Sequence, residues 1–243
     1  MIPVHVAIID DTKTINESNL AILAGALNAQ IQNDVAPYWH VAATCSAYPT
    51  GLIHTWSIHI QQQLDQPGAL GYHTDDNNQP IAYVELTSDY TVTVSHELLE
   101  MLVDPYGCRM TTAGLIDGLD YANFGLGIPS ERVAYLLEVC DPCESSSYQT
   151  GGVAVSDFLL PSWYRTFPGP GAYTHMQSCT KPCQVNDGGY VSFCNKEREW
   201  YQVFNENGQL SSQDLGKFDK ASYGSLREWV DQKARDYRKA QRT

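Results

Sequence analysis

The stretch that decides the fold is Thr91–Tyr106, TVTVSHELLEMLVDPY. Its apolar side chains run from Leu98 to Val103, among residue types that favour helices. Serine is a common helix-capping residue, so we expect a short helix to begin near Ser95. The helix should end at Asp104, because the residue before a proline is pushed out of the α region.

This helix carries three ionisable residues, His96, Glu97 and Glu100. Residues four apart project from one face of a helix, so His96 and Glu100 can converge on a single ion. Glu97 lies about a quarter-turn away, where a carboxylate could hold a water molecule bound to that ion. The alternative is a solvated helix face. The apolar neighbours predict a buried helix instead, and buried charges need partners or a metal.

The composition is that of an acidic globular protein of 243 residues, long enough for one or two domains. The formal net charge of -13 argues against nucleic acid and anionic membrane surfaces as partners. Residues 217–243 are the exception, with eight Lys/Arg against four Asp/Glu. The acidic body suits a cation site or a cationic substrate, although solubility alone would also account for it.

The N-terminal sequence MIPVHV lacks the basic and long apolar regions of a signal peptide. No run of eighteen apolar residues is present in the chain, so no membrane span is predicted. We therefore expect a cytoplasmic or virion-associated protein that has no membrane partner.

The seven cysteines are an odd number, and without an export signal they favour thiols or metal ligands over a disulfide framework. Cys140 and Cys143, together with Cys179 and Cys183, have the spacing of a four-cysteine structural zinc site. Disulfides and buried thiols remain the alternatives on spacing alone.

The first hundred residues predict strands and helices in a definite order before the Thr91–Tyr106 stretch. Apolar runs and alternation indicate strands, and helical spacing after a capping segment that starts at Asn16 indicates a helix that Pro37 ends. The predicted elements are a strand at 4–9, a helix at 20–35, strands at 41–48 and 55–62, and extended segments at 72–74 and 81–86 around a turn at 75–78. His54 and His59 are interpreted as polar strand residues.

This order, followed by an HExxE helix, resembles the N-terminal subdomain of zincin-type metallopeptidases, whose active helix carries HExxH. The resemblance covers residues 1–106 and is specific at His96 and Glu97. It implies a bound zinc ion, Glu97 as general base, and a peptide substrate that pairs with an edge strand. Tyr72–Thr74 and Ile81–Glu85 are the candidates for that strand.

Glu100 departs from the zincin pattern, which has histidine at this position in members of known activity. One histidine with two carboxylates makes a harder, more anionic site, which suits manganese or calcium as well as zinc. The departure therefore favours a second hypothesis, a non-catalytic zincin-like protein with an assembly role. Three further phrases, SHELLEMLVDPYG, LLEVCDPCE and GGVAVSDFLLPSWY, resemble a family of uncharacterised bacterial and phage proteins, which carries no activity with it.

A catalytic zinc ion keeps three protein ligands, so a third must come from beyond the helix. Zincins take it either just past the active helix or from a later element. Asp104 fits the first pattern and Glu138 the second, with Asp141 behind both. We favour Glu138 slightly, because it is an acid within an apolar segment. A solvated or capping carboxylate is the alternative for each of them.

A hydrolase also needs a group that stabilises the developing oxyanion. Tyr106, Arg109 and His175 are the candidates, and we rank Tyr106 and His175 first. No Ser-His-Asp elbow, phosphate-binding glycine loop or dinucleotide fingerprint is present in the sequence.

The remainder of the chain reads as irregular and rich in strands. A glycine-rich loop is expected at 107–127, a short helix or strand at 130–139, extended segments at 152–160 and 162–167, and paired strands at 188–194 and 200–204. Tyr223–Gln241 predicts a basic helix with Leu226, Trp229 and Val230 on one face. That helix is a candidate for binding a protein partner.

Together these features predict an α+β protein. Residues 1–106 form a zincin-like subdomain with a mixed sheet, 107–216 a loop- and strand-rich part, and 217–243 a basic helix. The predicted function is a metal-dependent, metallopeptidase-like hydrolase that acts on a peptide or protein. The alternative is a metal-binding protein with an assembly or partner-binding role of the phage or virion type.

Overall fold

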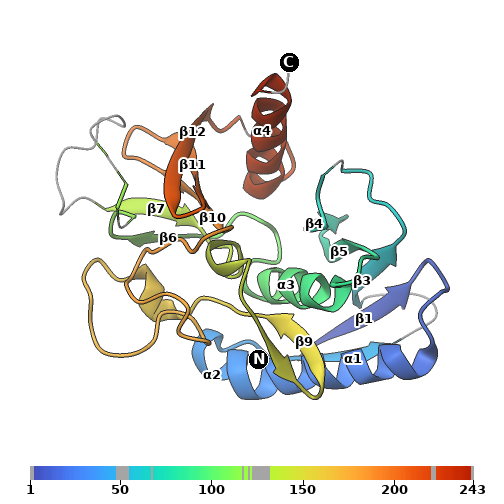
Figure 1. Cartoon of the computed structure of the whole chain (residues 1–243). Helices are drawn as coiled ribbons and strands as arrows, with labels where there is room; N and C mark the ends of the chain where they lie inside the picture. The colour runs from blue at the N-terminus through green and yellow to red at the C-terminus, as the bar shows by residue number, and fades with distance from the viewer. Residues whose placement is uncertain are drawn as a thin grey trace. The chain divides into compact units, whose positions relative to one another are not determined.

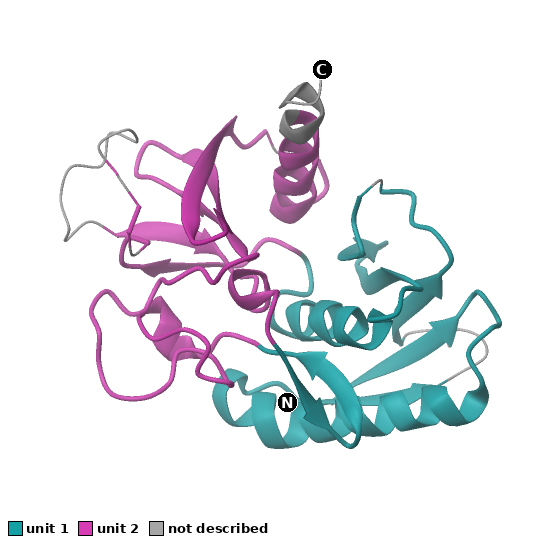
Figure 2. Ribbon diagram, in the orientation of Figure 1, with its two compact units in different colours: residues 1–106, 147–157 teal, residues 107–146, 158–243 magenta. Residues whose placement is uncertain are grey.

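The computed structural model describes residues 3–47, 55–66, 68–116, 118–119, 121, 132–219 and 223–241, with side chains as far as residue 236. The chain divides into two compact units (Figure 2). Unit 1 comprises residues 1–106 and 147–157, and unit 2 comprises residues 107–146 and 158–243. Residues 147–157, which we expected in the second part, therefore belong to the first unit.

Unit 1 is built on a five-stranded sheet with strand order β2-β1-β3-β5-β4 (Figure 1). The strands are β1 (Val4–Asp10), β2 (Ala43–Ala47), β3 (Trp56–Gln61), β4 (Gly71–Asp76) and β5 (Gln79–Glu85). The first three and β5 are parallel, and β4 runs antiparallel to β5 at one edge. Parallel strands are buried on both faces, which explains why β1 reads as a continuous apolar run.

The turn between β4 and β5 lies where the sequence predicted it. Asn77 and Asn78 both have positive φ, 53° and 62°. Two successive residues of this kind form the hairpin turn that matches the twist of the strands, and asparagine tolerates it well. This turn makes β4 the antiparallel edge of an otherwise parallel sheet.

The first helix is longer and less regular than predicted. The elements are α1 (Glu17–Ala29), a π-helical turn η1 (Gln30–Val35) and α2 (Ala36–Trp39). Asn16 caps α1 by accepting a hydrogen bond from the Asn19 backbone N–H at 2.8 Å. The prediction that Pro37 ends the helix is wrong, because Pro37 lies in the first turn of α2, where a missing N–H is tolerated.

The helix of the deciding stretch is α3 (Tyr90–Val103), which starts five residues before Ser95. The prediction of Ser95 as its first cap is wrong. Its hydroxyl donates to Gln30 Oε1 at 2.8 Å and accepts from the Ser156 backbone N–H at 3.1 Å. Buried tertiary partners therefore hold this serine inside the helix. Asp104 ends α3, as predicted from the following proline.

The core of unit 1 joins the sheet to α1, α3 and the hairpin of β8 (Ser147–Thr150) and β9 (Val153–Ser156). From α3 it takes Val94, Leu98, Met101 and Leu102. Each fully buried leucine or methionine contributes about 1.5–3 kcal/mol relative to an exposed one. This packing fixes the helix that carries the ionisable residues.

Unit 2 contains a five-stranded antiparallel sheet with strand order β12-β11-β10-β7-β6. The strands are β6 (Met110–Ala113), β7 (Val133–Leu136), β10 (Tyr190–Cys194), β11 (Glu199–Glu206) and β12 (Gln209–Lys217). The predicted pairing of the segments at 188–194 and 200–204 is confirmed. The expected loop at 107–127 contains β6, and its residues 117, 120 and 122–127 lie outside the described part.

Two short 3-10 helices, η3 (Asp141–Cys143) and η4 (Pro161–Tyr164), also belong to unit 2. The prediction of an extended segment at 162–167 is therefore wrong at its start. Pro161 suits the first position of a helix, and Trp163 is fully buried with its indole N–H donated to the Gln184 carbonyl at 2.8 Å. Burial of this large ring favours the tight turn over an extended chain.

The last helix, α4 (Leu226–Gln241), packs on the sheet of unit 2 with the predicted face. Leu226, Trp229 and Val230 form a cluster with side chains of β7, β11 and β12. The helix begins at Leu226, and Ser225 accepts a hydrogen bond from the Glu228 backbone N–H at 3.0 Å, as a helix cap does. The molecule thus has the mixed α+β character expected of it. Within the described chain, no helix is both long and apolar enough to cross a membrane.

Candidate metal centre

Helix α3 buries the three ionisable residues that the sequence singled out. His96 is 8% exposed, Glu97 3% and Glu100 0%. His96 Nε2 lies 3.4 Å from Glu100 Oε1, one helical turn along. The predicted convergence of these two side chains is present, and the reading of a solvated helix face is excluded by their burial.

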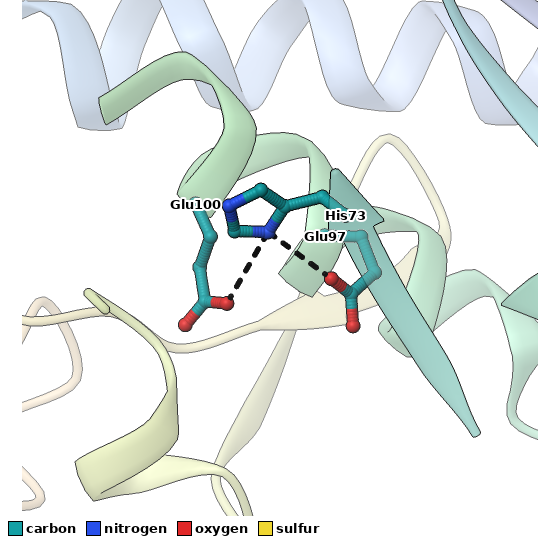
Figure 3. A group of neighbouring side chains, drawn as sticks. All are labelled: His73, Glu97 and Glu100. Carbon is teal, nitrogen blue, oxygen red and sulfur yellow. Dashed lines mark ion pairs between the residues drawn. The ribbon is translucent and has the colours of Figure 1, made fainter. Parts of the chain in front are cut away.

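A second histidine, His73, lies beside the two glutamates (Figure 3). It comes from the edge strand β4 and is 4% exposed. Its Nδ1 lies 3.4 Å from Glu97 Oε2 and 3.8 Å from Glu100 Oε2. The ligand atoms of His73, Glu97 and Glu100 all lie within 4.8 Å of one another, which is close enough to hold a metal ion.

The other nitrogen of His73 contacts a backbone carbonyl. Nε2 lies 3.2 Å from the backbone carbonyl of Asp104. A carbonyl only accepts, so Nε2 must carry a proton and donate it. In the neutral ring Nδ1 then presents a lone pair towards two carboxylates. A metal-binding histidine is held in this way, with its second nitrogen bonded to a carbonyl.

The separations between these atoms suit an ion better than direct hydrogen bonds. A charge-assisted N–H···O bond is about 2.7–2.9 Å long. Two ligands about 2.1 Å from one ion at the tetrahedral angle are about 3.4 Å apart. The two pairs at 3.4 Å, His73–Glu97 and His96–Glu100, match that spacing. His73 Nδ1 and Glu97 Oε2 are buried and have no hydrogen-bond partner.

No lysine or arginine of the same unit is buried beside Glu97 and Glu100 to balance their negative charge. Residues 1–106 and 147–157 contain a single such residue, Lys13. Lys13 is exposed. A buried carboxylate without a counter-charge costs several kcal/mol. A cation bound at the described atoms would remove that cost, so the residues present fit a divalent metal.

Gly71 allows β4 to approach α3 closely. It lies two residues before His73, and alternate residues of a strand face the same side. A Cβ at this position would lie 2.7 Å from Thr93 Cγ2 and 2.8 Å from Glu97 Oε1. Any larger residue would displace Glu97 or the strand.

The other candidates from unit 1 do not join the group of His73, Glu97 and Glu100. Asp104 is fully buried, and what it presents to His73 is its backbone carbonyl. Tyr106 is 47% exposed at the end of the segment. Among the described residues, the carboxylate of Asp104 is not a member of that group.

The remaining candidates, Glu138, Asp141 and His175, belong to unit 2. Glu138 is buried and forms an ion pair with Arg227 of α4, so a protein cation already neutralises it. Asp141 is the buried first residue of η3. His175 is half-buried and stacks on Phe158, with ring centroids 5.2 Å apart.

The four cysteines of the expected structural zinc site also lie in unit 2, and all four are buried. No group of three or more metal ligands in the described chain includes a cysteine. Cys179 Sγ contacts Asn186 Oδ1 at 3.3 Å, whereas Cys183 Sγ contacts the carbonyls of Trp163 and Arg165 at 3.6 Å. Cys179 and Cys183 are therefore buried thiols with separate hydrogen-bond partners.

Sequence reasoning missed His73. It named Tyr72–Thr74 as a candidate edge strand but assigned no role to the histidine within it. The alternation of GYHTDD could have indicated that Gly71 and His73 share one face. Nothing in the sequence says that this face meets α3, because that contact depends on the order of strands in the sheet.

The comparisons with known proteins add no relative. No family model matches the chain, and neither the curated proteins nor the solved structures give a match. The site is therefore interpreted from its own geometry.

Proposed function

We propose that this protein is a metal-dependent hydrolase whose centre lies on α3. In this proposal His96 and Glu100 bind the ion and Glu97 is the general base. The single observation that carries it is the burial of Glu97 and Glu100 in a unit whose only lysine or arginine is the exposed Lys13. Charges in such a place need a cation.

The roles of the residues follow from their positions. When bound, a divalent ion supplies a Lewis acid that polarises a carbonyl and makes water more acidic. Glu97, next to His96 in sequence, accepts the proton of the attacking water and returns it to the leaving group. His73 and Gly71 confine the Glu97 carboxylate from the side of β4.

The fold of unit 1 supports a peptidase-like variety of this function. The resemblance to zincins implies an edge strand above the helix, with Tyr72–Thr74 as one candidate, and these residues lie in β4 at the edge of the sheet. An exposed strand edge can pair with an extended peptide. The substrate proposed is therefore a peptide or protein, and the ion is zinc, with manganese or calcium as alternatives.

The proposal is tested with Glu97→Gln, which keeps the size of the side chain and removes its basicity. We expect hydrolysis of a peptide library by the metal-loaded protein to fall about 10²–10⁴-fold, the usual contribution of a general base. The metal content of the variant is measured alongside. Equal turnover by variant and wild type would overturn the role of Glu97.

A second function, metal binding without catalysis, is favoured by one observation. The most exposed of the ionisable residues, His96, is only 8% exposed, which leaves little of the centre open to a substrate. In that case the ion stabilises the fold, and the protein acts through a partner, for which the basic helix α4 is the candidate. Tight metal binding with no turnover of any peptide would support this alternative.

A further inference from the structure

We infer that Glu100 is shared by two cation positions, so that the centre holds two metal ions. The first position is that of the proposed function, between His96 Nε2 and Glu100 Oε1. The second lies between His73 Nδ1, Glu97 Oε2 and Glu100 Oε2. The inference rests on the proposed function for its first ion, whereas the second is argued from residues to which that function gave no ligand role.

The two oxygens of Glu100 face different histidines. Oε1 lies 3.4 Å from His96 Nε2, and Oε2 lies 3.8 Å from His73 Nδ1. A carboxylate whose two oxygens face two different histidines can bridge two metal ions, with one oxygen bound to each. Paired metal ions in hydrolases are about 3.5–4 Å apart, a distance that one bridging carboxylate spans.

One ion cannot be bound by all four side chains, His73, His96, Glu97 and Glu100, at these positions. Two ligands on opposite sides of an ion are at most about 4.2 Å apart when each is about 2.1 Å away. His73, Glu97 and Glu100 fall within 4.8 Å of one another, and in the described chain His96 is not a member of that group. At least one distance from the ligand atom of His96 to those of the other three residues is therefore greater than 4.8 Å. Two ligands of one such ion cannot be that far apart.

His73 has the features of a ligand in its own right. Its Nε2 donates to the Asp104 carbonyl, so its Nδ1 presents a lone pair. That nitrogen and Glu97 Oε2 are both in residues at least nine-tenths buried, and neither has a hydrogen-bond partner. When both atoms present lone pairs at 3.4 Å they repel each other, and a cation between them would relieve this repulsion.

The second position also changes how Glu97 works. With Oε2 on the second ion, Oε1 is the oxygen that remains for proton transfer. Of the Glu97 atoms, Oε1 lies nearest to the position that a Cβ of residue 71 would take, at 2.8 Å. The two oxygens of this side chain would then have separate tasks, one to bind and one to accept the proton.

The inference is tested by counting metal ions, with no need for activity. Wild type, His73→Asn and His96→Asn are loaded with Mn²⁺, dialysed and measured by elemental analysis. We expect two ions per chain in the wild type and one in each variant. Glu97→Gln is a second probe of the same position and should also hold one. His59→Asn is the matched control. His59 lies on β3 of the same sheet and pairs with the carboxylate of Asp11, so this variant should still bind two ions.

Electron paramagnetic resonance of the manganese supplies a second reading. Two ions bridged by Glu100 should show an exchange-coupled spectrum in the wild type and the six-line spectrum of isolated Mn²⁺ in the His73→Asn variant. One ion in the wild type that persists in His73→Asn would overturn the inference and leave the proposed function intact. One ion that persists in His96→Asn would overturn the ligand set of the proposed function, and no ion at all would overturn both.

Discussion

The two units bury carboxylates and neutralise them differently. In unit 2, Glu138 and Arg227 are each 5% exposed and form an ion pair with each other. In unit 1, Glu97 and Glu100 are at least as deeply buried, yet the unit's only lysine or arginine is Lys13 at the surface. The other fourteen such residues all belong to unit 2.

This difference is the basis on which we propose a structural role for the buried charge of unit 2 and a functional role for that of unit 1. A buried pair whose partners come from the same unit is complete by itself and needs no ligand. A buried group of acceptors without a protein cation has a position for one from solution. The contrast therefore supports the proposal that places the metal centre on α3 and β4, and not at the pair in unit 2.

The largest effect is expected where a complete pair is broken. Arg227→Met leaves Glu138 buried without its cation, which should lower the free energy of unfolding by about 3–5 kcal/mol. Urea unfolding measures the change. The double variant Arg227→Met with Glu138→Gln should recover much of the loss, because no charge is then left buried. A single variant as stable as wild type would mean that the two units handle charge alike.

A smaller effect is expected from removing the proposed cation. At a metal concentration about 100 times Kd, bound metal stabilises the folded state by about 2.7 kcal/mol, and a chelator should abolish this. Thermal unfolding with and without the chelator measures it. Glu100→Gln should make the protein insensitive to the chelator, whereas Arg227→Met should keep the full response. Chelation that leaves the wild-type melting temperature unchanged would contradict a metal in unit 1.

The smallest effect on stability is expected at Gly71. Gly71→Ala places a Cβ within 2.9 Å of Thr93 and Glu97, and such overpacking costs about 1–3 kcal/mol. We also expect weaker metal binding, measured by calorimetry, because Glu97 is displaced. Gly25→Ala in α1 is the matched control, since nothing lies within 4 Å of its Cβ and alanine favours helix. Equal metal affinity in both variants would argue that Glu97 is not a ligand.

Much of unit 1 could be predicted from local sequence. The apolar run of β1, the Asn77–Asn78 turn and the end of α3 before Pro105 each depend on residues that are adjacent in the chain. The burial of His96, Glu97 and Glu100 was also predictable, because their neighbours are apolar on all sides. Local propensity and pattern decide such features with little help from the rest of the fold.

The rest depends on partners that are distant in sequence. Ser95 looks like a helix cap until Gln30 and Ser156 bind its hydroxyl. Glu138 looks like a metal ligand until Arg227 reaches it from α4. His73 becomes relevant only when β4 lies at the edge of the sheet beside α3. In each case a tertiary contact overrides what the local sequence indicates.

The π-helical turn η1 places a limit on insertions and deletions in this chain. Its residue Gln30 is wholly buried, and its amide also donates to the Ser156 carbonyl at 3.0 Å. A π-helical turn carries a wider hydrogen-bonded ring than an α-helical one. Loss of one residue from Gln30–Val35 would change the winding between α1 and α2 by about 100°, so that Gln30 and α2 could not both keep their positions. An insertion or deletion within this turn would therefore disturb the buried contact between Gln30 and Ser95 on α3.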